Sequence, residues 1–299
     1  MTLLELIEQS SARLDQAGVS FGHGTTNAFD EAAWLVLWAL GHPLDALDEL
    51  GDTPVDDEAI KAARALVERR IATRQPTAYL TGEAWLQGVP FHIDSRAIVP
   101  RSLIAEALAE GSIDVWLGEH TERVLDLCTG NGSLAVLAAM AWPEVTVDAA
   151  DLSPDALAVA RLNIDRHALA DRVALHQGDG LAALPAGRCY DLILCNPPYV
   201  NAAAMASLPP EYRAEPALAL DGNTAGSRDG MDFIRALLRD APASMTTDAV
   251  LVLEIGHERP YFEAAFPALD ALWLTTSAGD DQVLLLTREN LLAAMPPRT

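Results

Sequence analysis

Residues 124–135 read Val-Leu-Asp-Leu-Cys-Thr-Gly-Asn-Gly-Ser-Leu-Ala. The apolar start predicts a buried strand over 124–127, and the two glycines predict a tight turn into a helix. Glycines at this point let the backbone approach a bound nucleotide closely at the helix N-terminus. The stretch therefore predicts the first strand and the ligand-binding loop of a doubly wound α/β domain.

Downstream of this loop, apolar strands alternate with helical segments, which is the pattern of a doubly wound parallel sheet. The strands are expected at 124–127, 145–149, 173–176, 190–195 and 250–253. Two more apolar runs, 272–276 and 283–287, are separated by only six residues, too few for a parallel crossover. One of these last two strands is therefore expected to run antiparallel to the other.

The first part of the chain differs, because apolar clusters at helical spacing occupy residues 1–84 without strand alternation. One helix is predicted to begin at the acidic residues 56–58 and to stop before Gln75-Pro76, since a residue before proline avoids the helical conformation. Residues 84–93 have a strand-turn-strand pattern with Gly88 at the turn. We therefore expect a helical domain over 1–84, a β-hairpin linker over 85–95 and an α/β domain over 96–299.

The chain has 299 residues, 50% of them apolar, with 20 Lys and Arg against 43 Asp and Glu, a net charge of −23. So acidic a surface repels phosphate backbones, which disfavours tight nucleic-acid binding. No stretch approaches the roughly 18 apolar residues of a membrane span, so we expect a soluble, cytoplasmic protein without a membrane partner. The three cysteines lack CxxC spacing and are expected to be buried free thiols, and no His or Cys cluster has metal-ligand spacing.

The glycine loop is compatible with two ligands. It satisfies the GxGxxA form of the dinucleotide fingerprint, and Asp151 follows at the distance of a ribose-binding acid. An NAD pyrophosphate would place negative charge near Asp126, whereas S-adenosylmethionine brings a sulfonium and an ammonium that attract a carboxylate. Asp126 therefore favours the methyl donor over a dehydrogenase cofactor. The donor loop is predicted to comprise Asp126, Thr129, Gly130 and Gly132.

Two further acids follow neighbouring strands. Asp151 stands at the tip of the second strand, where its carboxylate can accept both ribose hydroxyls, and a simple turn acid is the alternative. Asp179, in Gln-Gly-Asp-Gly after the third strand, is placed to reach the adenine amino group, and an ordinary loop residue is the alternative. Both residues are predicted to bind the donor.

Asn196-Pro197-Pro198-Tyr199 follows the strand 190–195 directly. An amide nitrogen is a poor nucleophile because its lone pair is delocalised, so it needs orientation more than deprotonation. The side-chain oxygen of Asn196 and the carbonyl of Pro197 are expected to accept its two N–H hydrogens and to turn the lone pair towards the methyl carbon. The prolines stiffen the loop, and Tyr199 offers a flat face to a planar group.

These motifs together resemble the class I S-adenosylmethionine-dependent methyltransferases that act on planar amino groups, and more closely the HemK/PrmB-like protein-glutamine methyltransferases. The resemblance covers essentially the whole chain. It implies a small helical N-terminal substrate-recognition domain, a hairpin linker and a seven-stranded catalytic domain whose last strand is antiparallel. It also implies methyl transfer from S-adenosylmethionine to the side-chain amide of a glutamine, leaving S-adenosylhomocysteine, without a metal.

Three segments resemble the branch of that family that modifies large-subunit ribosomal protein three, namely 79–85, 98–106 and 126–130. The release-factor branch usually carries Pro-Arg-Pro-Glu-Thr-Glu where this chain has Ser102-Leu-Ile-Ala after Pro100-Arg101. The expected substrate is therefore that ribosomal protein, before or during ribosome assembly. Glutamine methylation of release factors, adenine-amino methylation of nucleic acid and a non-catalytic binding module are the alternatives.

Residues outside these motifs support further predictions. Arg101 is expected to hold a backbone carbonyl or the substrate, and Glu215 to brace the loop behind Asn196. Trp34 and Trp38 lie one helical turn apart and can shape a docking surface. A basic stretch of one N-terminal helix is predicted to be a solvated face, and it comprises Arg64, Arg69, Arg70 and Arg74.

Overall fold

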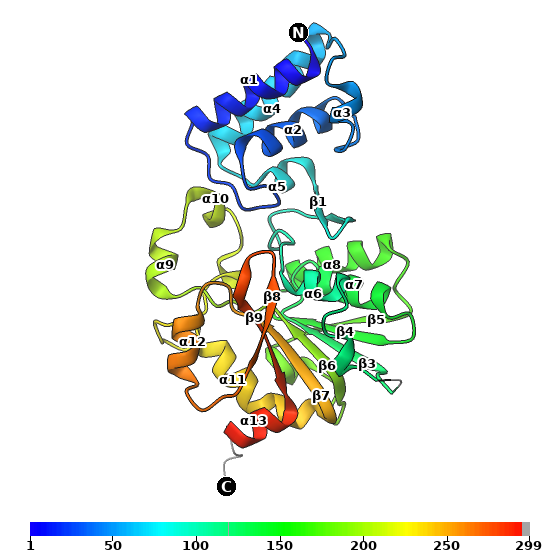
Figure 1. Ribbon diagram of the computed structural model, residues 1–299, viewed down its shortest axis with the longest axis vertical. Coiled ribbons are helices and arrows are strands. Elements are labelled where there is room, and N and C mark those ends of the chain that lie inside the picture. The colour runs from blue at the N-terminus through cyan, green and yellow to red at the C-terminus, as the bar shows by residue number, and fades with distance from the viewer. Residues whose placement is uncertain (119, 295–299) are drawn as a thin grey trace.

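The computed structural model describes residues 1–118 and 120–294, and it has a helical part above a sheet part (Figure 1). The helical part holds the N-terminus. Its helices are α1 (Leu3–Gln16), α2 (Ala28–Ala39), α3 (Leu47–Leu50), α4 (Asp57–Thr73) and α5 (Thr77–Thr81). α4 begins after Asp56 and ends before Gln75-Pro76, which confirms the predicted helix.

Capping residues set the starts of the long N-terminal helices. The Thr2 hydroxyl accepts a hydrogen bond from the Glu5 N–H, and the Asp56 carboxylate accepts from two N–H groups in the first turn of α4. The apolar faces of α1, α2 and α4 then pack into one core, formed around Leu6, Leu14, Leu35 and Val67. The helical part therefore has a hydrophobic core of its own.

A two-stranded hairpin follows the helices. β1 (Glu83–Leu86) and β2 (Val89–His92) pair antiparallel, and Gln87 and Gly88 between them both have positive φ. Two such residues form the turn whose twist matches that of a hairpin. The Asn163 side chain of α8 (Pro154–Arg166) accepts from the His92 N–H over 2.7 Å and donates to the His92 carbonyl over 3.0 Å. These two bonds fix the hairpin to the sheet part.

The described residues form a seven-stranded sheet in the order β5-β4-β3-β6-β7-β9-β8. β9 is antiparallel to both of its neighbours, so the last strand of the chain is the antiparallel one, as expected. The strands are β3 (Arg123–Leu127), β4 (Thr146–Asp151), β5 (Val173–Gln177), β6 (Tyr190–Cys195), β7 (Met245–Glu254), β8 (Leu272–Thr276) and β9 (Gly279–Thr287). β7 and β9 begin earlier than predicted. Their first residues are mostly polar, so a prediction based on apolar runs leaves them out.

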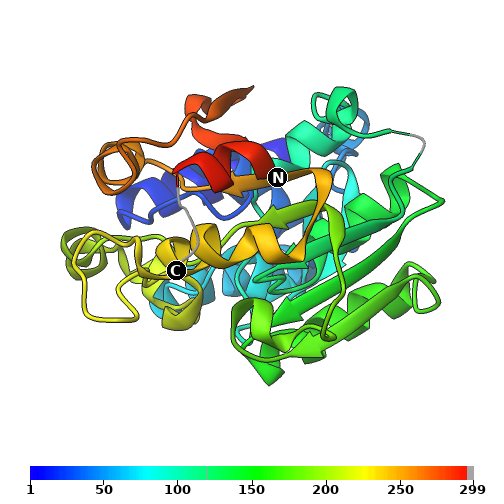
Figure 2. The ribbon, with the colours of Figure 1, turned by 90° about the horizontal axis from the view of Figure 1, so that it is seen from below.

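Helices cover both faces of the sheet. On one face α6 (Ile104–Ala109), α7 (Ser133–Ala141) and α8 pack on Val124 and Val147. On the other, α11 (Asp232–Asp240), α12 (Arg259–Ala265) and α13 (Arg288–Ala294) contribute to the core layer that contains Leu125 and Leu127. Figure 2 shows the gold α11 and the red α13 close together on that face. Successive residues of β3 are thus buried in opposite layers, which is why the strand reads as an apolar run.

Between β6 and α11 the chain makes a long excursion that carries the short helices α9 (Ala202–Ser207) and α10 (Pro210–Arg213). We call residues 200–230 the bridging loop, because α10 reaches up to the helical part in Figure 1. Its base is closed by the Val200 N–H, which donates to the Leu220 carbonyl over 2.9 Å, and by the Gly222 N–H, which donates to the Val200 carbonyl over 3.2 Å. The loop is therefore anchored directly after Tyr199.

The cysteines are free, but they are not all buried. Cys195 lies in the central strand β6 and is buried, as predicted, whereas Cys128 and Cys189 are partly exposed. The prediction was wrong for these two because they lie outside the strands, Cys128 in the turn after β3 and Cys189 just before β6. None of the described helices is long and apolar enough to cross a membrane.

Candidate active site

The donor loop is a strained turn at the carboxyl end of β3. Cys128, Gly130 and Gly132 all have positive φ, and α7 begins at Ser133 directly after them. A Cβ on Gly132 would lie 3.0 Å from the Cβ of Ala160 in α8, so glycine also permits the close approach of that helix. The loop thus exposes backbone groups at a helix N-terminus, as the sequence predicts.

Asp126 is buried beneath this loop, with 1% of its surface exposed. One carboxylate oxygen, Oδ2, accepts hydrogen bonds from the Thr129 hydroxyl over 2.5 Å and the Ala135 N–H over 3.0 Å. The other, Oδ1, is buried without a hydrogen-bond partner among the described residues. Burial raises the pKa of Asp126 from 3.8 to about 7, although both hydrogen bonds act in the opposite direction. A buried carboxylate oxygen that accepts no hydrogen bond favours a cationic partner, because the cation offsets the cost of burying the negative charge.

Asp151 lies at the tip of β4, next to the same loop. Its Oδ2 accepts from the Gly130 N–H over 2.9 Å and its Oδ1 from the Ser153 N–H over 2.8 Å. Burial raises the pKa of Asp151, and these backbone bonds oppose that rise. Asp179 is exposed in the next loop, whose Gly178 N–H donates to the Asp151 carbonyl over 3.1 Å. The structure therefore brings the three acid-bearing loops to one edge of the sheet.

Asn196-Pro197-Pro198-Tyr199 occupies the adjacent strand tip, because β6 pairs with β3. Asn196 is half-buried, and its side chain makes no hydrogen bond within the described part of the chain. The Tyr199 ring lies against Gly256, where a Cβ would come within 2.7 Å of the Tyr199 Cε2. Burial and the nearby Glu254 carboxyl raise the pKa of the Tyr199 hydroxyl. Gly256 leaves room for this ring, a role that its place at the end of the strand does not reveal from the sequence.

Glu254, at the end of β7, ties a second segment to this region. Its Oε2 accepts from the Ser102 hydroxyl over 2.5 Å and from the Leu103 N–H over 2.9 Å. Burial raises the pKa of Glu254 to about 7. The carboxyl therefore holds the start of the 102–109 segment against the strand that supports Tyr199.

Arg101 makes a bidentate ion pair. Its two terminal nitrogens lie 2.6 and 2.8 Å from the oxygens of Glu215, which also accepts from the Val99 N–H over 3.0 Å. Burial opposes ionisation of Glu215, but Arg101 and the neighbouring His23 hold its pKa at about 2. Glu215 thus braces the bridging loop against the 99–101 segment. Arg101 also contacts the Val99 carbonyl over 3.3 Å.

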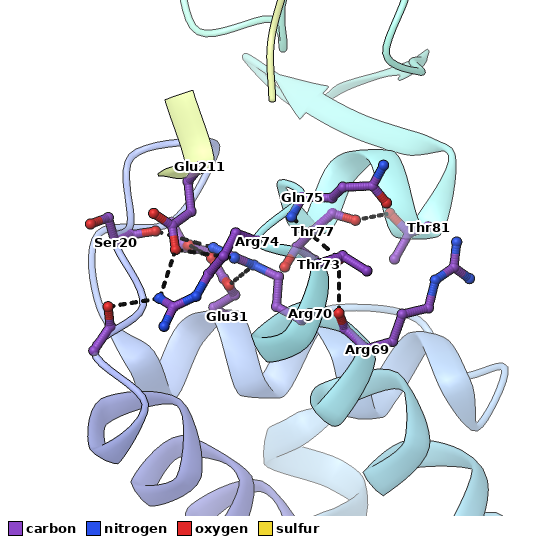
Figure 3. Close-up of polar contacts among 12 residues, drawn as sticks. Ser20, Glu31, Arg69, Arg70, Thr73, Arg74, Gln75, Thr77, Thr81 and Glu211 are labelled. Carbon is purple, nitrogen blue, oxygen red and sulfur yellow. Dashed lines mark hydrogen bonds and ion pairs between the residues drawn. The ribbon is translucent and has the colours of Figure 1, made fainter. Parts of the chain in front are cut away.

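A second group of buried charges joins the helical part to the bridging loop (Figure 3). Arg70 of α4 is fully buried and donates to Glu31 over 2.7 Å. Glu211 of α10, also fully buried, lies 3.1 Å from Arg74 and 3.6 Å from Arg70. Arg74 donates in addition to the Gly18 carbonyl over 2.8 Å. We call Glu31, Arg70 and Glu211, together with the partly exposed Arg74, the buried charge cluster.

The buried charge cluster corrects one prediction. The basic stretch of α4 is not a solvated face throughout, because Arg70 points into the interface with α10 and meets two carboxylates there. Burial would raise the pKa of Glu211, yet hydrogen bonds from backbone groups and from Arg74 hold it below its ordinary value. Beside the cluster, His23 of the helical part lies 3.3 Å from Glu215 and packs against Tyr212, with ring centroids 4.3 Å apart and ring planes tilted by 49°. The sequence carries no signal for these pairings.

The fold and the site together define a class I S-adenosylmethionine-dependent methyltransferase. The features that define it are the strand order of the sheet, the antiparallel β9, the glycine turn after β3 and the acidic residues at the ends of the next strands. Two family descriptions match the chain, "PrmC N-terminal domain" over residues 5–82 and "Methyltransferase small domain" over residues 103–208. Within the described residues, no group of three or more His, Cys, Asp or Glu is arranged to hold a metal ion.

Curated relatives place the chain more closely. Proteins named ribosomal protein uL3 glutamine methyltransferase are similar to it in Bordetella pertussis (53% identical, covering 97% of this chain and 96% of that protein), in Burkholderia pseudomallei (48%, covering 98% and 96%) and in Bradyrhizobium diazoefficiens (44%, covering 97% and 92%). A solved methyltransferase from Pyrococcus furiosus aligns with 17% identity and a TM-score of 0.48, over 76% of this chain and 98% of that one. The chain belongs to the family of ribosomal protein uL3 glutamine methyltransferases.

Proposed function

We propose that the protein transfers a methyl group from S-adenosylmethionine to the side-chain amide nitrogen of a glutamine in ribosomal protein uL3. The observation that carries this proposal is the identity of 44–53% to relatives of that name over nearly the full length of both chains. The strand-tip site supports the chemistry, because a buried acid, a glycine turn and an amide-bearing loop adjoin one another there.

The residues of the donor loop fit the methyl donor. Asp126 Oδ1 is a buried carboxylate oxygen without a hydrogen-bond donor in the described chain, and a cationic ligand would satisfy it. Gly130 and Gly132 supply the positive φ angles of the loop, and Asp151 and Asp179 extend the acidic edge to the neighbouring strand ends. Bound S-adenosylmethionine supplies an electrophilic methyl group on a sulfonium sulfur.

Asn196 and Pro197 orient the substrate in this proposal. The Asn196 side chain is free of internal hydrogen bonds among the described residues, so its oxygen is available to one N–H of the glutamine amide. The Pro197 carbonyl takes the second N–H, while Pro198 and Tyr199 bound the planar group. A side-chain base is unnecessary, because the methylated amide is strongly acidic until water removes its proton.

The three parts of the chain have different roles in this proposal. Residues 1–84 act in substrate recognition, residues 85–95 as the linker and residues 96–299 in methyl transfer, with Arg101 next to the substrate segment. The net charge of −23 attracts a free, basic RNA-binding protein and is repelled by one already covered with RNA. The substrate is therefore uL3 before or during ribosome assembly, in the cytoplasm, and the enzyme makes no tight contact with nucleic acid.

Purified enzyme incubated with three substrates tests the proposal. Free uL3, mature ribosomes and a peptide chain release factor are each treated at two ionic strengths, and intact-mass and fragment mass spectrometry locate any methyl group. We expect glutamine methylation of free uL3, faster at low salt, and little modification of the other two. Preferential methylation of release factor would overturn the substrate, and exclusive methylation of the RNA in the ribosomes would overturn the chemistry too.

A further inference from the structure

An apolar groove of about 650 Å³ lies between the helical part and the hairpin. One wall is α2 with the loop that follows it, and the other includes β1, which α2 and α3 overlie in Figure 1. The lining residues on which the argument depends are Phe29, Asp30, Trp34, Leu44, Asp45 and Trp85.

Three large apolar side chains around this groove are exposed to solvent. Phe29 and Leu44 each expose 37% of their surface and Trp85 exposes 46%. Trp85 points outward from β1 because its neighbour Ala84, on the opposite face of the strand, is buried. Clustered exposed apolar groups on a soluble protein mark an interaction site, and aromatic residues are the usual anchors of such interfaces.

Trp34 links the groove to the surroundings of the donor loop. Trp34 lines the groove. It also belongs to a hydrophobic cluster that contains Ala97 and Val99 of the segment after the hairpin. The carbonyl of Ile98, between those two residues, accepts from the Asn131 side chain of the donor loop over 3.2 Å. A chain bound in the groove would therefore contact Trp34, which belongs to the same hydrophobic cluster as the segment that borders the donor loop.

The charge of the groove selects the kind of chain that fits it. Its described lining residues include Asp30 and Asp45 and no lysine or arginine. An occupant with basic side chains and one apolar anchor would match this lining. Ribosomal proteins neutralise RNA phosphates with Lys and Arg, so their segments have this composition.

We propose that this groove docks a basic segment of the protein substrate, with an aromatic or aliphatic side chain of that segment held against Trp85 and Phe29. The proposal rests on the proposed function and adds where the substrate is recognised. It also separates the two tryptophans that the sequence places together, since Trp34 lines the groove and Trp38, 44% exposed on the same helix, is not among the lining residues.

Steady-state methylation of free uL3 by intact mass tests the groove. The double substitution Phe29→Ala/Trp85→Ala is expected to raise KM at least tenfold, with kcat within twofold and the affinity for S-adenosylmethionine unchanged. Trp38→Ala is the matched control, because it removes an exposed tryptophan from α2 outside the groove, and its KM is expected to stay at the wild-type value. Leu44→Ser, in the loop that follows α2, gives a second measurement if the double variant is unstable, and we expect it to raise KM severalfold.

The acidic lining gives an independent reading. Asp45→Asn is expected to raise KM severalfold at low salt and little at high salt, whereas Asp15→Asn, an exposed acid elsewhere in the helical part, leaves KM unchanged. An unchanged KM for both the double variant and Leu44→Ser overturns the docking proposal while the wild-type enzyme still methylates uL3. A parallel fall of kcat with weaker donor binding also overturns it, because that pattern assigns the groove to the donor site. If the wild-type enzyme leaves uL3 unmodified, the proposed function itself fails.

Discussion

The donor loop and the buried charge cluster both depend on buried carboxylates, but they are assembled differently. Asp151 meets the Gly130 N–H across 21 residues of chain and the Ser153 N–H across two. Glu211 meets Arg74 across 137 residues, and its other neighbour, Arg70, lies in the last turn of α4, which ends directly before Arg74. The first arrangement follows from the local rule that parallel strands end at one edge, whereas the second exists only once the two parts of the molecule have docked.

We expect substitutions near the donor loop to change catalysis and substitutions in the buried charge cluster to change stability. Asn196, beside the donor loop, is expected to give the largest effect on catalysis. Asn196→Ala is expected to lower turnover about a thousandfold, equivalent to about 4 kcal/mol in the barrier. Donor binding should be nearly unchanged, because the lost oxygen orients the nucleophile. Methyl-transfer rates and calorimetric titration of S-adenosylmethionine on one preparation measure both quantities. Activity within a few fold of wild type would reject the orienting role.

A substitution that breaks the buried charge cluster should instead lower the free energy of unfolding. Glu211→Ala leaves Arg70 and Arg74 without their shared carboxylate, and we expect the free energy of unfolding to fall by about 3 kcal/mol, the scale for removing one partner of a buried pair. Glu68→Ala is the control, because Glu68 lies on the same helix and pairs with Arg13 at the surface over 2.7 Å. Denaturant unfolding should show a clear loss for the first variant and almost none for the second. Equal effects would show that burial does not distinguish the two pairs.

Removing the acid next to the donor loop should act on binding without a comparable loss of stability. Asp151→Ala is expected to weaken S-adenosylmethionine binding by about 1 to 3 kcal/mol, the scale for leaving ligand hydroxyls without their charged acceptor. Calorimetric titration measures the affinity. Unchanged donor affinity would contradict its assignment to the ribose, and Asp151 would then be only the acceptor for the loop N–H groups.

The smallest expected effect is a pH dependence that arises at Asp126. Its pKa of about 7 in the folded chain, against an ordinary 3.8, means that the folded state binds this proton more tightly than the unfolded state. Its contribution to stability therefore falls as pH rises from about 4 to about 7. A cationic ligand needs the ionised form, so donor affinity should rise severalfold between pH 6 and pH 7.5. Asp126→Asn should flatten that difference in titrations at the two pH values, and a persisting rise would place the titration elsewhere.

The central strands were predictable because they contain runs of apolar residues buried on both faces, as Val124 and Leu125 of β3 show, whereas the edge strands β5 and β8 are partly exposed. The loop geometry at Gly130 and Gly132 was predictable for the same local reason, since left-handed turns need glycine. The roles assigned to the residues at the strand tips stay predictions.

The contacts that position Tyr199 and α10 were not predictable. Gly256 and Glu254 act through residues far away in sequence, and Arg70 reads as one more basic residue in a helix that has several. Whether such a side chain is solvated or buried depends on which element docks on it. No spacing or composition in the helix carries that information.

The pairs of the buried charge cluster can form at different times during synthesis of the chain, because Glu31 is made long before Glu211. It lies 39 residues before Arg70 and hydrogen-bonds to it within the helical part, whereas Glu211 follows Arg74 by 137 residues. At about 5–20 residues per second, a ribosome takes roughly 7 to 27 s to make that intervening chain. During this interval Arg70 already has a carboxylate partner within its own folding unit. The helical part can therefore fold on the nascent chain with this guanidinium paired, and α10 later docks on a preformed surface.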